Sequence, residues 1–344
     1  MKNFLHSVSC SDADRLSILF VMSDWSDREH VWSSYSWDNE TNFSGPLGPK
    51  HPLLVAVNIS IACLALLGNG LVITVMLARR SVFSSTVNRL ILHQSIIDAI
   101  TAVVFFLQKI FSESFAVVSV KNTFFDEFLC RVLYSDFFLW FLYVTSTYNI
   151  VIISLDRFMA TVYPLKHRKL NSSNKVKFAI AVPWGIGFAH GFQFVFVYQP
   201  NQGLCEAVPR NRTFLLVSTA IVVSIEYVVP ITILLYTYTG ILITLKRRKT
   251  RPVSGRQDFF RRAKTNVLKI VVLVGSAFII CWAPAEVDYV LARVFYIYSS
   301  EPIYNAFIVL VSCNTAINPI IYCFTYEHFR AQLKDVLGKG LGRN

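Results

Sequence analysis

The residues that could do chemistry in this chain are a few polar side chains set inside long apolar stretches. A polar group in such surroundings is costly, so each one calls for a reason. An acid among them must be neutralised, be hydrated or hold a cation. A hydrogen-bond network that only clamps helices together is the alternative, and the residues alone leave both open. Five such residues fall in four stretches: Asn69, Asp98, Ser146, Asn314 and Asn318.

Other charged residues also border or interrupt apolar stretches. Asp156 and Arg157 directly follow an uncharged stretch, where an adjacent acid and base could pair as a simple cap. Glu226 and Glu286 lie within apolar stretches, and Glu286 comes four positions after Trp282, on the same face of a helix. A buried carboxyl of this kind should be protonated, bonded to a neighbour or ready to bind a cation.

The elements that must position these residues are membrane-spanning helices. Apolar residues make up 54% of the 344 residues and charged residues only 16%, below the usual quarter. An apolar stretch of about 18 residues can cross the hydrocarbon core, and lipid forces it to be helical because it offers the backbone no hydrogen-bond partner. The sequence therefore predicts an all-α membrane protein, a bundle of seven transmembrane helices. The spans are 52–78, 90–111, 137–155, 178–198, 213–245, 270–294 and 302–326.

The loops between the spans carry unequal positive charge. Of the 33 Lys and Arg, 21 fall in 79–89, 166–177, 246–264 and the tail after Tyr326. By the positive-inside rule these segments are cytoplasmic and the N-terminus is outside. The net charge of +12 then implies no nucleic-acid partner, because anionic inner-leaflet lipid and an acidic protein surface suffice as counterparts. We predict a multi-pass protein of the plasma membrane.

The outer side of the chain holds sequons and two cysteines. Residues 1–51 are predicted to be an extracellular, mostly disordered tail that is glycosylated at Asn39 and Asn42, with Asn211 as a further outer acceptor. Cys130 and Cys205 both face the oxidising compartment, where a disulfide between them is plausible. The bundle occupies 52–325, and 326–344 are cytoplasmic.

Three prolines, Pro230, Pro284 and Pro319, interrupt predicted spans. Each removes one backbone hydrogen bond and bends its helix, so that one half could swing against the other. Membrane helices also simply tolerate proline, and spacing does not separate these two interpretations.

Taken in order along the chain, these residues resemble the rhodopsin-like (class A) G-protein-coupled receptors over about residues 52–338. Trp184 and Tyr238 also suit the pattern. The resemblance implies a seven-helix bundle, and Phe329-Arg330 would open a short amphipathic eighth helix within 326–344. The motifs that carry the resemblance are Gly68-Asn69, Asp156-Arg157-Phe158, Cys281-Trp282-Ala283-Pro284 and Asn318-Pro319-Ile320-Ile321-Tyr322.

The resemblance also implies roles for single residues. Arg157 would meet a heterotrimeric G protein once the sixth helix swings outward, and Cys130 and Cys205 would tie the second outer loop to the third helix. The G-protein switch would comprise Asp156, Arg157, Tyr238 and Tyr322. The activation relay would comprise Trp282, Phe278, Pro230, Pro284, Asn318 and Pro319. An allosteric sodium ion, the sole cofactor expected, would be held by Asp98, Ser146, Asn314 and Asn318.

Three departures from the family pattern matter. Cys130 lies two residues farther from Arg157 than is typical, and Thr147 stands where a branched apolar residue usually joins the relay. Lys264 stands where some relatives keep an acid that locks Arg157, so some basal activity is expected.

Other functions are disfavoured by what the sequence lacks. An enzyme would need a nucleophile or metal motif, and a transporter or channel, the runner-up class, would show repeated or broken spans. A light sensor needs a lysine in 302–326, and an amine receptor needs an acid where Leu139 stands. A peptide ligand is the first expectation, with a small cationic or lipid-like molecule as the alternative. Arrestin is a further expected partner, although 327–344 holds no Ser or Thr. The ligand contacts would be Glu286, Glu226, Trp282 and Gln108.

Overall fold

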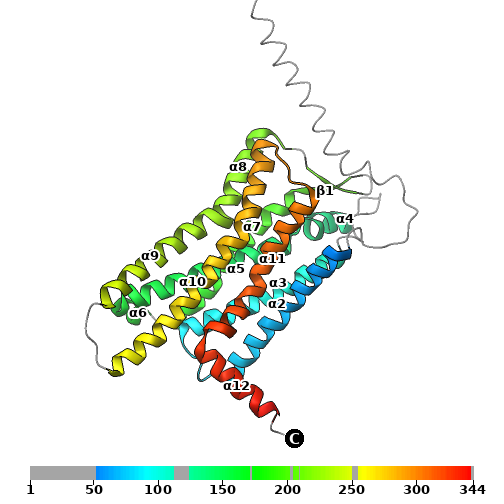
Figure 1. Ribbon diagram of the computed structural model, residues 1–344. Coiled ribbons are helices and arrows are strands. Elements are labelled where there is room, and N and C mark those ends of the chain that lie inside the picture. Colours follow the sequence, from blue (N-terminus) through cyan, green and yellow to red (C-terminus); the bar gives the residue numbers. More distant parts are fainter. Residues whose placement is uncertain are drawn as a thin grey trace, which may run out of the picture. The chain divides into compact units, whose positions relative to one another are not determined.

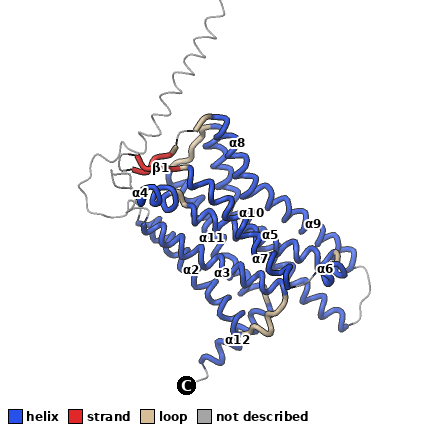
Figure 2. Tube along the Cα trace, turned by 180° about the vertical axis from the view of Figure 1, so that it is seen from behind, coloured by secondary structure: helices blue, strands red, loops and turns tan. Residues whose placement is uncertain are grey.

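The computed structural model describes residues 52–111, 124–170, 173–201, 204–208, 210–249 and 255–341. Within these residues, seven helices are long and apolar enough to cross a membrane. Figures 1 and 2 show them side by side as one bundle. The predicted all-α bundle of seven spans is confirmed. The predicted outer tail, with Asn39 and Asn42, lies outside the described residues.

The helices of the first four spans are followed by an outer hairpin. The third span begins with irregular turns. The antiparallel strands β1 and β2 pair with each other, and Pro200 of β1 lies opposite Cys205 of β2. These two short strands are an addition to the predicted architecture. The elements are α2 Pro52–Ala78, α3 Thr86–Phe111, α4 Phe124–Phe128, the π-helix η1 Leu129–Tyr134, α5 Phe137–Val162, α6 Pro164–Leu170, α7 Ser173–Phe192, the 3-10 helix η2 Gln193–Phe196, β1 Tyr198–Asn201 and β2 Leu204–Ala207.

The second half holds the remaining three spans and a short final helix. The fifth span is formed by α8 Arg212–Val223, the π-helix η3 Ser224–Val228 and α9 Val229–Lys249. The sixth comprises α10 Gly255–Val290 and the π-helix η4 Leu291–Phe295, the seventh is α11 Glu301–Thr325, and α12 Glu327–Leu341 follows it.

The bundle buries polar residues and exposes apolar ones, as a protein in lipid should. Asp98 and Asn318 are fully buried, whereas Leu67 and Ile280 are 72% and 67% exposed on the outside of their helices. Lipid can cover an exposed leucine at no cost, but it cannot bond a carboxylate or an amide. The polar side chains therefore meet between the helices.

The first and seventh spans meet at a proline. Gly68 of α2 allows the approach, because a Cβ on this residue would lie 3.0 Å from the Cβ of Pro319. Pro319 has no N–H to donate to the Thr315 carbonyl one turn earlier. The amide of Asn69 donates to that freed carbonyl at 2.9 Å. The Gly68-Asn69 pair thus fits the proline bend of α11.

The eighth helix α12 is fixed to the bundle by its first turns. Phe329 is 1% exposed and packs with Phe83, and Arg79 at the end of α2 pairs with Asp335. Tyr326, between α11 and α12, donates to Asn88 of α3 at 2.9 Å.

Candidate functional site

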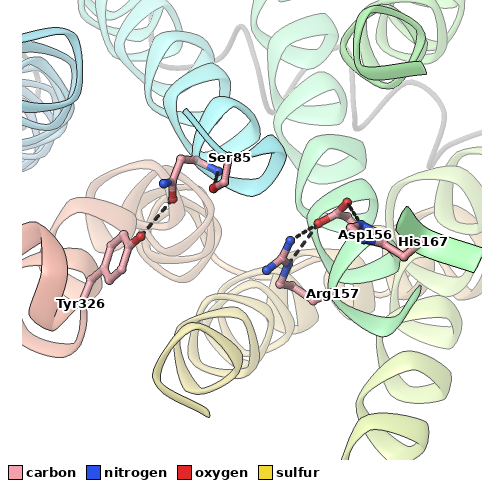
Figure 3. A network of polar contacts seen from close by, with 6 residues as sticks. Ser85, Asp156, Arg157, His167 and Tyr326 are labelled. Carbon is pink, nitrogen blue, oxygen red and sulfur yellow. Dashed lines mark hydrogen bonds and ion pairs between the residues drawn. The ribbon is translucent and has the colours of Figure 1, made fainter. Parts of the chain in front are cut away.

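The C-terminal end of α5, predicted to be cytoplasmic, carries a linked acid and base. Arg157 donates from two of its nitrogens to the Asp156 carboxylate, and His167 of α6 contacts the other carboxylate oxygen at 2.9 Å. Figure 3 shows Arg157 and His167 on either side of Asp156. Both side chains of the pair are less than one-fifth exposed. The adjacent pair predicted from the sequence is thus formed, and α6 holds it from one side. The side chain of Lys264 lies outside the described residues.

The other two residues of the predicted switch lie in a closed apolar layer. Tyr238 and Tyr322 are 7% and 2% exposed. The Tyr238 hydroxyl donates to the carbonyl of Val271 on α10 at 2.7 Å. A cavity of only about 10 Å³ remains beside Tyr322, lined by isoleucines and valines of α3, α5 and α10. In this conformation α10 therefore packs against the bundle at the level of Tyr238 and Tyr322.

Gly275→Ala is expected to loosen this packing. A Cβ at Gly275 would lie 1.9 Å from the Tyr238 hydroxyl, so the ring must move and its bond to Val271 must break. A lost neutral hydrogen bond shifts a two-state equilibrium by roughly 2- to 10-fold. For the kind of receptor that the sequence resembles, we expect basal second-messenger production per copy at the cell surface to rise by that factor. Gly70→Ala is the control, because a Cβ there meets nothing within 4 Å. Equal basal signals from the two variants would contradict the prediction.

The predicted polar core is assembled around Asp98. Ser146 of α5 donates to one carboxylate oxygen at 2.7 Å, and Asn318 of α11 donates to the other at 2.8 Å. Asn314, the fourth residue expected here, is not among the hydrogen-bond partners of Asp98. Its Oδ1 atom is buried and has no hydrogen-bond partner within the described part of the chain. The core therefore differs from the expected set of four.

Gln94 is a member of this core that the sequence interpretation missed. Its amide nitrogen lies 3.0 and 3.1 Å from the two oxygens of Asp98 and 2.5 Å from the hydroxyl of Ser146. The signal was available, because a residue four positions before Asp98 lies on the same helix face. A glutamine inside an apolar span needs a hydrogen-bond partner, and that need is visible in the sequence.

A cluster of aromatic side chains packs around Trp282, between the helices. Trp282 is 1% exposed and contacts Phe278, Tyr143 and Trp140 at ring-centroid distances of 5.7, 5.9 and 6.3 Å. The ring of Trp140 is stacked on Phe194 of η2, with the planes 8° apart. The structure thus joins Trp282 and Phe278 of the predicted relay. Two other relay residues, Pro230 and Pro284, interrupt the hydrogen bonds of the fifth and sixth spans.

Pro230 also positions an acid. It cannot donate to the carbonyl of Glu226, and the chain widens there into the π-helix η3, which buries the Glu226 side chain. His190 of α7 contacts a Glu226 carboxylate oxygen at 2.6 Å, with both side chains almost fully buried. Sequence interpretation missed His190, which lies 36 residues away in another helix.

Glu286 lies beside this pair. It is 5% exposed and hydrogen-bonded to Glu226, yet its Oε2 atom has no hydrogen-bond partner within the described residues. Two carboxyls in contact share one proton, so the pair of Glu226 and Glu286 keeps a net charge of −1. One added positive charge would balance it. Asp288, two residues further along the same span, accepts a hydrogen bond from Ser299 instead.

Gln108, the last predicted ligand contact, belongs to a separate group of contacting residues, together with Leu133 and Asp136. Its amide donates to Asp136 and, at 3.4 Å, to the carbonyl of Leu133. Asp136 adopts a left-handed conformation with φ 61, two residues after the end of the π-helix η1 and one before α5. The chain is therefore irregular between η1, which holds Cys130, and α5.

The disulfide between Cys130 and Cys205 is confirmed, and it joins η1 to β2. Tyr134 and Tyr198 contact each other edge-to-face beside it, at 5.0 Å. Asn211, the described sequon residue, is exposed at the start of α8, where its side chain caps the helix by accepting from Phe214 at 2.8 Å.

Together, the bundle, the closed apolar layer beside Tyr322 and the polar core around Asp98 form the arrangement expected of a seven-transmembrane receptor. A model of the family "7 transmembrane receptor (rhodopsin family)" matches residues 68–322, and the chain belongs to this family. It is therefore a multi-pass membrane protein of a receptor family.

Three relatives illustrate the similarity. The chain is 30% identical over 309 residues to galanin receptor 2b of Danio rerio, covering 84% of this chain and 76% of the relative. It is 26% identical over 296 residues to the allatostatin-A receptor of Bombyx mori, covering 80% and 77%. It is 28% identical over 306 residues to the substance-K receptor of Canis lupus familiaris, covering 85% and 76%.

Proposed function

We propose that this chain is a plasma-membrane receptor for an extracellular peptide, and that it activates a heterotrimeric G protein rather than catalysing a reaction. The relatives named for galanin, allatostatin-A and substance K support the peptide class. The excess of Lys and Arg in alternate loops supports an extracellular N-terminus. Anionic inner-leaflet lipid and arrestin are the further partners that we propose for the cytoplasmic face.

The observation that carries the ligand assignment is the acid cluster one turn from Trp282. His190 occupies one oxygen of Glu226, whereas Glu286 keeps a buried oxygen without a partner among the described residues. A buried carboxyl of this kind is costly unless a donor or a cation reaches it. A basic group of the peptide, a side chain or the terminal amine, would supply both.

The peptide class is tested with cells that express the receptor. Tissue extracts are fractionated, and each fraction that raises a second messenger is retested after treatment with a protease. We expect the active fraction to lose its effect on digestion. An active fraction that withstands complete proteolysis would replace the peptide by a small cationic or lipid-like ligand.

Glu286→Gln is expected to weaken a basic peptide agonist by roughly 1.5–3 kcal/mol, about 10- to 150-fold in Kd. The amide keeps the size of the side chain but removes the charge that meets the ligand. Competition binding measures the loss, and an analogue with its basic group neutralised should show almost none. Asp288→Asn is the matched control, because Asp288 is bonded to Ser299. Equal losses for the basic and neutral ligands would show that Glu286 supports the helix instead.

A further inference from the structure

We propose that the side-chain amide of Gln94 replaces the sodium ion that the polar core of this family is expected to hold. The receptor should then be insensitive to sodium. This inference does not depend on which ligand the receptor binds, because it concerns only the contacts around Asp98.

The position of the Gln94 nitrogen is the first argument. The two carboxylate oxygens of Asp98, which carry the negative charge, and the hydroxyl oxygen of Ser146 are among the expected cation ligands. The Gln94 nitrogen lies 2.5 to 3.1 Å from all three. A cation bound to the same three oxygens would have to occupy the same place. The amide and the ion therefore exclude each other.

The hydrogen-bond count gives the second argument. An ionised carboxylate only accepts, and every partner of Asp98 here is a donor: the hydroxyl of Ser146, the amide of Asn318 and the amide of Gln94. One hydrogen of Gln94 serves Asp98 and the other serves Ser146, so both amide hydrogens are used. The residues present thus satisfy the acid without an added cation, and they do not fit a resident sodium ion.

A relay of hydrogen bonds across three helices fixes which end of the Gln94 amide faces Asp98. The indole of Trp184 can only donate, so the His93 nitrogen that it reaches at 2.8 Å must accept. The other His93 nitrogen then donates to Asn149 at 2.8 Å, and the Asn149 amide donates to the Gln94 carbonyl at 2.8 Å. The carbonyl oxygen of Gln94, the atom that could bind a cation, is turned away from Asp98.

The remaining oxygens do not offer an alternative site of equal strength. The Oδ1 atoms of Asn314 and Asn318 are buried and have no hydrogen-bond partner among the described residues. Both belong to neutral amides, so neither supplies the negative charge that would offset the cost of dehydrating a cation. The charged oxygens of the core are those that Gln94 already occupies.

The experiment measures thermal unfolding of the purified, ligand-free full-length receptor in sodium chloride and in N-methylglucamine chloride of equal ionic strength. We expect the midpoint of the natural chain to differ by less than about 1 °C between the two salts. Gln94→Leu removes the amide and exposes Asp98 and Ser146 to a cation. Its midpoint should rise by about 2–4 °C in sodium. The double variant Gln94→Leu with Asp98→Asn should lose that rise.

Two results would overturn the proposal. The first is a natural receptor that sodium stabilises and whose stabilisation disappears in Asp98→Asn. The second is a folded Gln94→Leu receptor that stays insensitive to sodium, because something other than the amide would then exclude the ion. If Gln94→Leu does not fold, the comparison of the natural chain with Asp98→Asn still decides the question.

Discussion

Arg157→Ala is expected to reduce agonist-driven G-protein activation to the level of cells without receptor, while surface expression stays close to that of the natural chain. In the described part of the chain, both hydrogen bonds of Arg157 go to its neighbour Asp156. Removing the side chain therefore breaks no hydrogen bond between two helices, and His167 still contacts Asp156. What is lost is the guanidinium that would meet the G protein. Nucleotide exchange on a purified G protein and surface labelling measure the two effects.

The control is Arg168→Ala, which removes the same charge from an exposed position on α6. It should signal normally, because its side chain takes no part in the pair of Asp156 and Arg157. Asp156→Asn should act in the opposite direction and raise basal activity, because it weakens the contact that restrains Arg157. An Arg157→Ala receptor that activates the G protein fully would show that the switch is assigned to the wrong residue.

The spans were predictable from the sequence because lipid imposes a strong and local requirement. Each crossing helix needs a long stretch almost without charge, and such stretches are visible without any knowledge of their neighbours. A proline also leaves a known carbonyl unpaired, the one four residues earlier in the helix. For Pro319 this is the carbonyl of Thr315, to which Asn69 donates. Sequence spacing thus predicted Asp98, Ser146 and Asn318 as members of the polar core, but it missed Gln94.

The acid cluster shows where such prediction ends. Glu226 and Glu286 could be placed near each other by counting turns from Pro230 and Trp282. The partner His190 could not, because its distance from Glu226 depends on how α7 packs and on the π-helix η3. A π-helix rotates every residue beyond it, and no local pattern marked where the extra residue would enter. The π-helix η1 and the left-handed Asp136 were likewise not predictable from the spacing.

Loss of the disulfide should be the most damaging change on the outer side. Cys130→Ser and Cys205→Ser should each reduce surface expression severely and to a similar degree. Removing a native disulfide costs about 2–5 kcal/mol in small secreted domains, which is a large part of a marginal stability. The bond joins residues 75 positions apart and fixes the hairpin β1–β2 to the start of the third span. Without it, the contact of Tyr134 with Tyr198 still links η1 to β1, and the bond from Arg131 to the Val195 carbonyl links η1 to η2.

The double variant separates a broken bond from two independent faults. If Cys130 and Cys205 are partners, replacing both should cost little more than replacing one, because the first change already breaks the bond. All variants are made in a Cys10→Ser background, so that a third outer cysteine cannot pair with the one left over. Cys63→Ser is the control for removing an exposed, unpaired cysteine, and it should leave surface expression unchanged. Flow cytometry of labelled receptor measures the surface level, and losses that add up in the double variant would contradict the bond between these two residues.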